Sequence, residues 1–243
     1  KLPHQYIIKS PDMYRTRVGV DLAKKVIQVC IYRNKKVQSN IEMTPEEFLS
    51  WLINNKPVTI IFEACSTSNY WKQKALQAGH DARLISAKLV SVVRQNQKTD
   101  KNDALAIVQA TFMPDVTFIG GKTVEQQQLQ SIKRLRELAV KQRDASQKQI
   151  IALLFELNIK ISKRRGGIIS AIESVLEDAT NELSAECRRA IFLAKEHLNG
   201  LFKDVKHYDE CMEKSVNTHP ECKKLLRLEG VGAMNAINLY IAL

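Results

Sequence analysis

Cysteine is sparse in this 243-residue chain, and the spacing of the cysteines argues against domains held together by disulfides or by a zinc site. The five cysteines are odd in number, scattered and never spaced as Cys-x-x-Cys, which argues against a disulfide framework or a paired-cysteine zinc site. No apolar run approaches the roughly 18 residues of a membrane span, and no signal-peptide segment opens the chain. We therefore expect a cytoplasmic protein with reduced thiols and no membrane partner.

Acidic residues are scarce in the first two thirds of the chain. Residues 1–165 carry 28 Lys and Arg against 14 Asp and Glu, whereas residues 166–243 carry 9 against 12. A polyanion such as nucleic acid is the partner expected for the basic part, and the acidic remainder is better suited to contact protein. The alternative is a basic surface that faces only solvent.

Glycine and proline are absent from residues 124–162, where apolar residues recur at intervals of three and four. This pattern predicts one long helix, or two nearly collinear helices. Further helices are expected at 168–179 and 184–217, the second antiparallel to the long helix. An intramolecular helical hairpin and a dimerising coiled coil account for the pattern equally well.

The first half of the chain mixes strand and helix patterns. Strands are predicted at 17–21, 26–32, 36–41, 57–64 and 81–86, and helices at 45–53, 68–78 and 101–113. Thr44 and Glu47 form a capping box before the first of these helices. Three meandering strands followed by strands reached through helices indicate a ribonuclease H-like mixed sheet, in which the first and fourth strands are neighbours.

Four carboxylates lie at strand ends or at a helix start of this predicted fold. Asp21 ends the first strand, Glu63 ends the fourth, and Asp100 and Asp103 lie three residues apart at the start of a helix. Such a cluster selects hard cations, Mg²⁺ or Mn²⁺, which support phosphoryl transfer. Asp103 and Asp21 could instead be a helix-start residue and a turn former, but Glu63 directly after an apolar strand is costly without a partner.

Basic and glycine residues supply candidate nucleic-acid contacts. The candidates beside the carboxylates, on the long helix and at its end are Lys24, Lys98, Lys101, Lys133, Arg134, Arg136, Lys141, Arg143, Lys148, Arg164 and Arg165. Their alternative roles are to offset the carboxylates or to form a solvated helix face. Gly230 and Gly232 indicate either a helix-hairpin-helix that binds a phosphate through backbone N–H groups, or a plain turn. Because the chain stops on LYIAL, we expect the natural protein to continue.

Three segments carry a family resemblance. VGVDLAKKVIQV, FEACSTSNYW and KTDKNDALAI resemble, in the right order, the motifs of the DEDD transposases of bacterial insertion sequences, the family that includes the Piv DNA invertases and the bridge-RNA-guided recombinases. The sequence departs from that pattern at Ser66, where glycine is frequent, and at Thr99, where asparagine is common. Neither change touches a carboxylate, so the resemblance assigns Asp21, Glu63, Asp100 and Asp103 as the catalytic and metal-binding tetrad.

The resemblance implies an organisation and partners. It predicts a RuvC/ribonuclease H-like catalytic domain at 1–121, a helical coiled-coil domain at 122–217, and the start of a helix-hairpin-helix transposase domain at 218–243. It implies Mg²⁺ or Mn²⁺, DNA, a guide RNA and a homo-oligomer, either dimer or tetramer. The family's nucleophilic serine lies in a C-terminal segment that this chain lacks, so the chain alone is expected to be inactive. Ser66 and Ser68 are expected to cap the following helix.

Three other functions remain open at this point. A RuvC-like structure-specific endonuclease would use the same fold and need no serine. An actin-like or sugar-kinase-like phosphotransferase shares the VGVDLAKK pattern, but it would need a second similar domain where residues 122–243 are helical. A metal-free nucleic-acid scaffold is the alternative that is not an enzyme.

Overall fold

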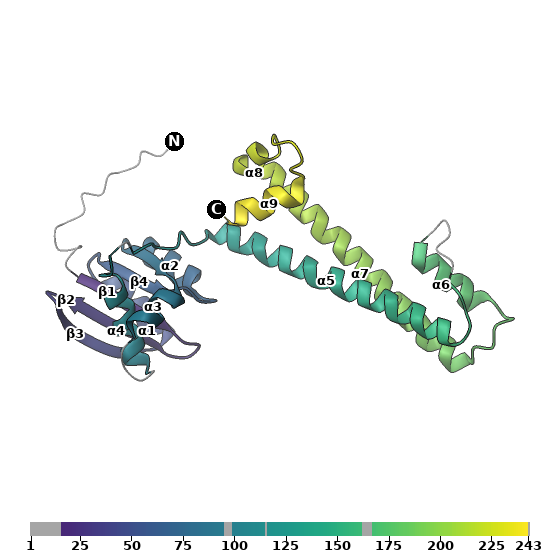
Figure 1. Ribbon diagram of the computed structural model, residues 1–243, viewed down its shortest axis with the longest axis horizontal. Coiled ribbons are helices and arrows are strands. Elements are labelled where there is room, and N and C mark those ends of the chain that lie inside the picture. The colour runs from purple at the N-terminus through teal and green to yellow at the C-terminus, as the bar shows by residue number, and fades with distance from the viewer. Residues whose placement is uncertain (1–15, 95–98, 115, 162–166, 243) are drawn as a thin grey trace. The chain divides into compact units, whose positions relative to one another are not determined.

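The structure of the protein is a computed structural model that describes residues 16–94, 99–114, 116–161 and 167–242 (Figure 1). The chain divides into two compact units, residues 1–125 and 126–243. Each unit has its own apolar core, so each is described by itself.

A five-stranded mixed sheet forms the centre of the first unit. Its strands are β1 (Thr16–Leu22), β2 (Ile27–Arg33), β3 (Lys36–Met43), β4 (Thr59–Glu63) and β5 (Asp81–Ile85). They lie in the order β3-β2-β1-β4-β5, with β1, β2 and β3 antiparallel and β4 and β5 parallel to β1. The first and fourth strands are therefore neighbours, and the predicted ribonuclease H-like fold class is confirmed.

Helices cover both faces of this sheet. Val18, Val20 and Phe62 face a core with Phe48 of α1 (Pro45–Asn54) and Trp71 of α2 (Ser68–Gln77). The other face packs through Ile61 against α3 (Ala87–Val93) and α4 (Asp100–Ala110). The predicted capping box is present at α1, whereas α3 was not predicted from the sequence. Because side chains alternate along a strand, Asp21 and Glu63 share the face that α4 covers.

Gly19 permits the close approach of α4 to β1. A Cβ atom at Gly19 would lie 2.2 Å from the carbonyl oxygen of Ala104 and 2.7 Å from Cγ2 of Val108. Backbone cannot move aside as a flexible side chain can, so a larger residue would push the helix away. Gly19 thus sets the distance between the end of β1 and the first turn of α4.

The second unit is a helical hairpin with shorter helices at its ends. Its elements are α5 (Val124–Glu156), α6 (Gly167–Glu177), α7 (Ala185–Thr218), α8 (Pro220–Leu225) and α9 (Ala233–Ala242). Leu129 of α5 shares a cluster with Met212 of α7, and Ile150 of α5 shares another with Leu198 of α7. The two long helices are therefore antiparallel and pair within one chain, as the hairpin alternative predicted (Figure 1).

The end of α5 corrects one expectation. The helix ends at Glu156, whereas the periodicity predicted that it would run to about residue 162. Asn158 adopts a positive φ of 60°, which an asparagine tolerates better than most residues and which ends an α-helix. Among the described helices, none is both long enough and apolar enough to cross a membrane.

Candidate active site

Asp21 and Glu63 lie at the carboxyl ends of two adjacent parallel strands. Val20 of β1 pairs in register with Phe62 of β4, and each carboxylate follows directly in its own strand. Both side chains are partly exposed, in contrast to the fully buried residues before them. Strand pairing therefore places the two carboxylates side by side at one edge of the sheet.

Asp100 and Asp103 occupy the first turn of α4. Thr99 caps this helix, its hydroxyl accepting a hydrogen bond from the backbone N–H of Asn102 at 3.3 Å. Asp103 is 5% exposed, and Asp100 is exposed. The helix N-terminus favours negative charge at both positions. With α4 held against β1 at Gly19, its first turn faces the strand ends that carry Asp21 and Glu63.

The electrostatics of Asp21 record this proximity. Burial, followed by the negative charges of Asp103, Glu63 and Asp100, raises the pKa of Asp21 to about 6. The positive charge of Arg94 acts in the opposite direction. A carboxyl group whose pKa is raised by three neighbouring carboxylates lies where a cation would relieve repulsion.

The donor set suits a hard divalent cation, but the carboxylates are not closed around one point. Within the described ranges, no three His, Cys, Asp or Glu side chains converge tightly enough to hold a metal ion. Asp103 is turned toward Arg94, whose Nε lies 2.6 Å from its Oδ1. Both atoms are shielded from solvent, and they meet as a charge pair and not as an aligned hydrogen bond. Arg94 was not predicted as a site residue from the sequence; it lies at the end of α3, a helix that was not predicted either.

A polar relay links the sheet to the first turn of α4. Gln28 is 1% exposed and lies opposite Asp21 on β2. Its Nε2 donates to Oδ1 of Asn40 at 2.7 Å, and Nδ2 of Asn40 donates to the backbone carbonyl of Lys101 at 2.9 Å. The relay therefore joins β2 and β3 to the helix turn that carries Asp100 and Asp103. The signal in the sequence is an amide side chain inside an otherwise apolar strand.

Two predicted contacts flank the carboxylates, and several others lie elsewhere. Lys24 follows β1 and Lys101 lies on α4, and both are exposed. Lys98, Arg164 and Arg165 lie outside the described residues. Gly230 has a positive φ of 78° and, with Gly232, lies between α8 and α9, as a helix-hairpin-helix or a plain turn requires.

The basic residues of α5 fall into two groups. Lys133 pairs with Glu137 at 3.3 Å, Arg136 pairs with Asp209 of α7, and Arg143 pairs with Asp144 at 2.7 Å. The other three are exposed, and none has an ion pair within the described part of the chain: Arg134, Lys141 and Lys148. These three are spaced by seven residues and therefore lie on one face of the helix.

The expectation that Ser66 and Ser68 cap α2 was wrong. The residue before α2 is Thr67, and its side chain makes no capping hydrogen bond. Ser68 is buried inside the first turn, where its hydroxyl accepts from the N–H of Cys65 at 3.1 Å and donates to the Cys65 carbonyl at 2.9 Å. Ser68 therefore closes the turn after Glu63, and Ser66 does not cap the helix.

A sequence model of transposases, that of the DEDD type found in IS110 elements, matches residues 18–159, more than half of the chain and the whole segment with the four carboxylates. The chain belongs to this DEDD transposase family. The family resemblance proposed from the three motifs is confirmed.

Individual members of the family extend the match along most of the chain. The transposase for insertion sequence element IS1111A of Coxiella burnetii is 27% identical over 92% of this chain and 62% of its own length. A probable family 20 transposase of Pseudomonas aeruginosa is 27% identical over 92% of this chain and 67% of its own length. The chain thus spans about three fifths to two thirds of these DEDD relatives.

A solved structure is also similar to part of this chain. RuvC of T. thermophilus, in complex with a Holliday junction substrate, is 13% identical, with a TM-score of 0.32 over 43% of this chain and 99% of RuvC.

Proposed function

We propose that this chain carries the catalytic part of a transposase that cleaves and rejoins DNA strands by divalent-metal-dependent phosphoryl transfer. The observation that carries the proposal is that Asp21, beside Glu63 at adjacent strand ends, lies near enough to the two carboxylates of α4 to feel their charge. Membership of the transposase family supports the class of reaction. Asp21, Glu63, Asp100 and Asp103 are the proposed catalytic residues.

The same four side chains would hold Mg²⁺ or Mn²⁺. Carboxylate oxygens are the ligands these ions prefer, and the repulsion on Asp21 supplies the reason to bind a cation. When bound, such ions activate the attacking oxygen and stabilise the leaving oxygen of an in-line displacement. The protein's contribution is to fix the carboxylates, two on rigid strand ends and two on a helix whose position Gly19 and Asn40 set.

Arg94 is the proposed stand-in for a cation within this cluster. Its guanidinium pairs with Asp103, which is nearly buried, and its positive charge offsets part of the repulsion that Asp103, Glu63 and Asp100 exert on Asp21. A divalent ion would compete with this pair, because both require the same carboxylate oxygens.

The basic surfaces are proposed to bind nucleic acid. Lys24 and Lys101 flank the carboxylates, and Lys98 comes two residues before Asp100 in the sequence. These three lysines would contact the phosphates of the DNA that is cut. The candidates on and after α5, including Arg164 and Arg165, would contact a guide RNA or DNA backbone. Gly230 and Gly232 would present backbone N–H groups to a phosphate. A homo-oligomer is the proposed assembly.

The boundaries proposed from the sequence are retained for this function. The catalytic domain would comprise residues 1–121, the helical domain residues 122–217, and the start of the helix-hairpin-helix domain residues 218–243. The two compact units meet between residues 125 and 126, four residues from the first of these boundaries.

The test pairs metal binding with strand cleavage. Asp21→Asn and Glu63→Gln each remove one charge without changing the size of the side chain. We expect both to abolish Mn²⁺ binding, measured by electron paramagnetic resonance, and DNA strand transfer, measured in a protein extended to the length of its relatives. Glu46→Gln, at an exposed carboxylate of α1, is the matched control and should leave both unchanged. Strand transfer that survives in both site variants would refute the proposal.

A structure-specific endonuclease is the second candidate, because all four carboxylates lie between residues 21 and 103 and a water-activating site needs no serine. Incubating this chain with branched DNA and Mn²⁺ separates the two functions. Nicking that depends on Asp21 would favour the endonuclease. If this chain does not nick branched DNA and the extended protein carries out strand transfer, the transposase is favoured.

A further inference from the structure

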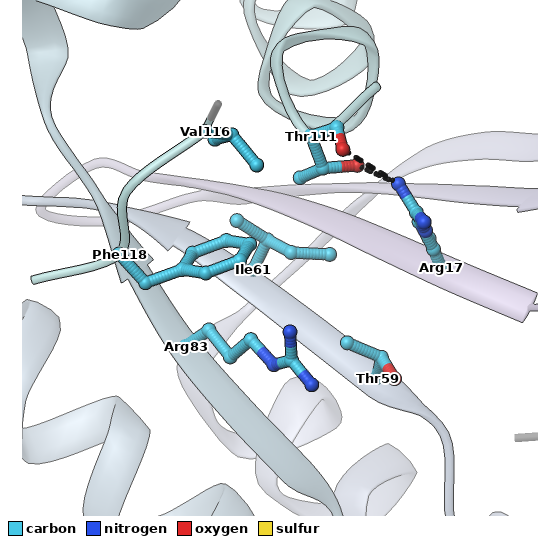
Figure 2. Close-up of a pocket in the computed structure, with 7 residues that line it drawn as sticks. All are labelled: Arg17, Thr59, Ile61, Arg83, Thr111, Val116 and Phe118. Carbon is cyan, nitrogen blue, oxygen red and sulfur yellow. Dashed lines mark hydrogen bonds between the residues drawn. The ribbon is translucent and has the colours of Figure 1, made fainter. Parts of the chain in front are cut away.

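A cavity of about 180 Å³ lies near the starts of β1 and β4, whereas Asp21 and Glu63 lie near the ends of these strands; Figure 2 shows the side chains that line the cavity. Seven residues of the first unit line it, namely Arg17, Thr59, Ile61, Arg83, Thr111, Val116 and Phe118. At about 30 Å³ for each water molecule, this space holds several waters, or one tetrahedral anion with part of its ester groups. Two arginines and no carboxylate are among the seven lining residues.

Strand register brings the polar lining residues onto one face. Arg17 at the start of β1 pairs with Thr59 at the start of β4, and Ile61 pairs with Arg83 of β5. This is the same face that carries Asp21 and Glu63 at the far ends of the strands. Asp21 is the fourth residue after Arg17, which corresponds to about 13 Å of extended chain. The cavity is thus a separate site at the other end of α4, closed there by Thr111.

Arg17 enters the cavity with unused hydrogen-bond donors. Its Nη1 donates to the backbone carbonyl of Thr111 at 2.9 Å and to the Thr111 hydroxyl, and its Cζ lies 4.1 Å from the ring centroid of Phe112. Within the described ranges, no carboxylate pairs with it, and its Nε and Nη2 donate no hydrogen bond. Burial, followed by the charge of Arg83, lowers the pKa of Arg17, which records two guanidinium groups held close together.

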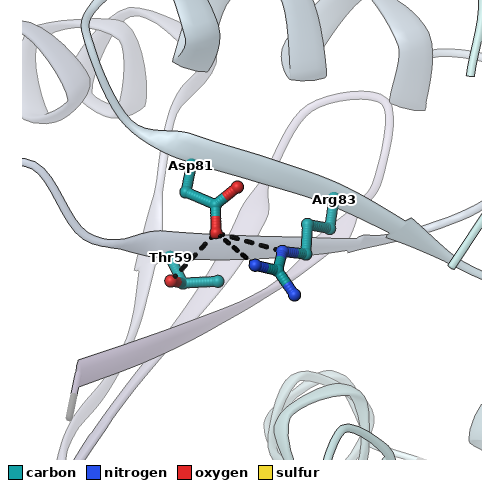
Figure 3. A network of polar contacts seen from close by, with 3 residues as sticks. All are labelled: Thr59, Asp81 and Arg83. Atoms are coloured by element: carbon teal, nitrogen blue, oxygen red, sulfur yellow. Dashed lines mark hydrogen bonds and ion pairs between the residues drawn. The ribbon is translucent and has the colours of Figure 1, made fainter. Parts of the chain in front are cut away.

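Arg83 is paired with a carboxylate and held in place. Its Nε and Nη2 both donate to Oδ2 of Asp81, at 3.0 and 2.7 Å, and Thr59 donates to the same oxygen at 3.3 Å (Figure 3). Its Cζ lies 5.0 Å from the ring centroid of Phe118, which fixes the guanidinium plane. Nη1 remains as a donor that bonds to nothing in the described residues. Arg17, Arg83 and Asp81 together leave one net positive charge.

We propose that this cavity binds a single phosphodiester group of a nucleic-acid backbone, held between Arg17 and Arg83. A phosphodiester carries one negative charge, which matches the one net positive charge of the site. Its two non-bridging oxygens suit two guanidinium groups that approach from β1 and β5, on either side of β4, because guanidinium and phosphate form strong, directional hydrogen bonds. The choice of a nucleic-acid backbone over other phosphates rests on the proposed function.

The test is a titration of the full ¹⁵N-labelled chain with a dinucleotide that contains one phosphodiester. We expect saturable shifts of the arginine Nε–Hε signals of Arg17 and Arg83, with a Kd of about 1 mM, as befits one isolated contact of about −4 kcal/mol. The same dinucleotide with a neutral methylphosphonate linkage should not bind. Inorganic phosphate should bind more weakly than the diester, and tighter binding of inorganic phosphate would show that the site takes a free anion and would overturn the proposal.

Variants separate a binding site from a structural ion pair. Arg17→Gln and Arg83→Gln should each weaken dinucleotide binding at least tenfold, whereas Arg189→Gln, at an exposed arginine of α7, should leave it unchanged. Asp81→Asn adds one net positive charge and should tighten binding several-fold, an effect that a purely structural role would not produce. Absence of saturable shifts, or equal affinity of the wild type and the Arg17→Gln variant, would refute the site.

The outcome is distinguishable from that of the proposed function. Dinucleotide binding requires no metal and no cleavage, so Asp21→Asn should bind the dinucleotide like the wild type. Phosphodiester binding in a protein whose strand transfer survives both carboxylate substitutions would leave the cavity assigned and the proposed function refuted. Comparing short RNA and DNA strands of one sequence then identifies which backbone the cavity prefers.

Discussion

Arg94 Nε lies 2.6 Å from Oδ1 of Asp103, so a guanidinium occupies the flank of the carboxylate cluster where a cation is expected to bind. Arg94→Gln would remove this charge and leave Asp103, nearly buried, without its partner. We expect the metal-free variant to lose about 2 to 3 kcal/mol of unfolding free energy, because a nearly buried carboxylate would be left without the charge that pairs with it. We also expect it to bind Mn²⁺ more tightly than the wild type.

Calorimetric titration with Mn²⁺ and thermal unfolding check both expectations for Arg94. Lys88→Gln, at an exposed lysine of the same helix, is the control and should change neither quantity. Weaker Mn²⁺ binding in the Arg94→Gln variant would mean that the arginine assists the metal site and does not compete with it.

Asp21 gives the first unit a dependence of stability on pH. Its pKa is raised from 3.8 to about 6 in the folded chain, first by burial and then by Asp103, Glu63 and Asp100. A carboxyl group with a raised folded pKa contributes stability that is present below about pH 4 and is lost as the pH rises through 6. At pH 7.5, the uncharged Asp21→Asn variant should therefore melt at a higher temperature than the metal-free wild type.

Melting curves at pH 4.5 and pH 7.5 check this sign. Because Asp21 is only half buried, we expect a gain at pH 7.5 of about 2 to 4 °C, equivalent to about 1 kcal/mol, and a smaller gain at pH 4.5. Arg94 offsets part of the repulsion in both proteins and should not reverse the order. A variant that is less stable than the wild type at pH 7.5 would contradict the cited cause.

Gly19 is predicted to be the least replaceable glycine of the first unit. In Gly19→Ala the new methyl group would meet the Ala104 carbonyl at 2.2 Å, so α4 must move or the strand must bend. Overpacking of this kind costs about 1 to 3 kcal/mol, and the displaced α4 should also weaken Mn²⁺ binding. Gly120→Ala is the matched control, because its Cβ would meet nothing within 4 Å. Equal unfolding midpoints in urea for the two variants would count against this packing.

The sequence predicted much of the fold because its local signals agree with the tertiary structure. The capping box at Thr44 and the strand ends at Asp21 and Glu63 each depend on residues that are contiguous in the sequence, so the local sequence pattern is enough to predict them. Helix α3 was missed because seven residues are too few to show a clear helical period, and its apolar residues pack against β4, β5 and α4, which lie elsewhere in the sequence. Arg94 was missed with it.

Long-range contacts explain the remaining omissions. The relay from Gln28 through Asn40 to Lys101 joins residues 12 and 61 positions apart; strand pairing brings Gln28 to Asn40, and the packing of α4 against β3 brings Asn40 to Lys101. Arg17 and Arg83 likewise become neighbours of one cavity because β4 lies between their strands. Each of these side chains has an ordinary surface role when read in its own segment, and its function depends on pairing that no single segment encodes.

The basic face of α5 gives the last prediction. Arg134, Lys141 and Lys148 repeat at seven-residue intervals and are exposed, whereas Lys133, Arg136 and Arg143 are engaged with acidic neighbours in the same unit. The exposed three should therefore contact a phosphate backbone more readily, since no ion pair must first be broken. Reversing all three to glutamate should weaken binding to structured RNA and lower the slope of log K against log salt by about 3, roughly one unit for each lost phosphate contact.

Fluorescence anisotropy at several salt concentrations measures both quantities. The control reverses three exposed lysines of α7, Lys203, Lys206 and Lys214, which changes the net charge of the chain by the same amount. If binding followed total charge alone, the two triple variants would lose the same affinity and the same slope. A loss confined to the α5 variant assigns the contact to that face, because only a localised backbone contact distinguishes two proteins of equal net charge. Equal losses of affinity and slope in the two triple variants would refute a nucleic-acid contact at this face of α5.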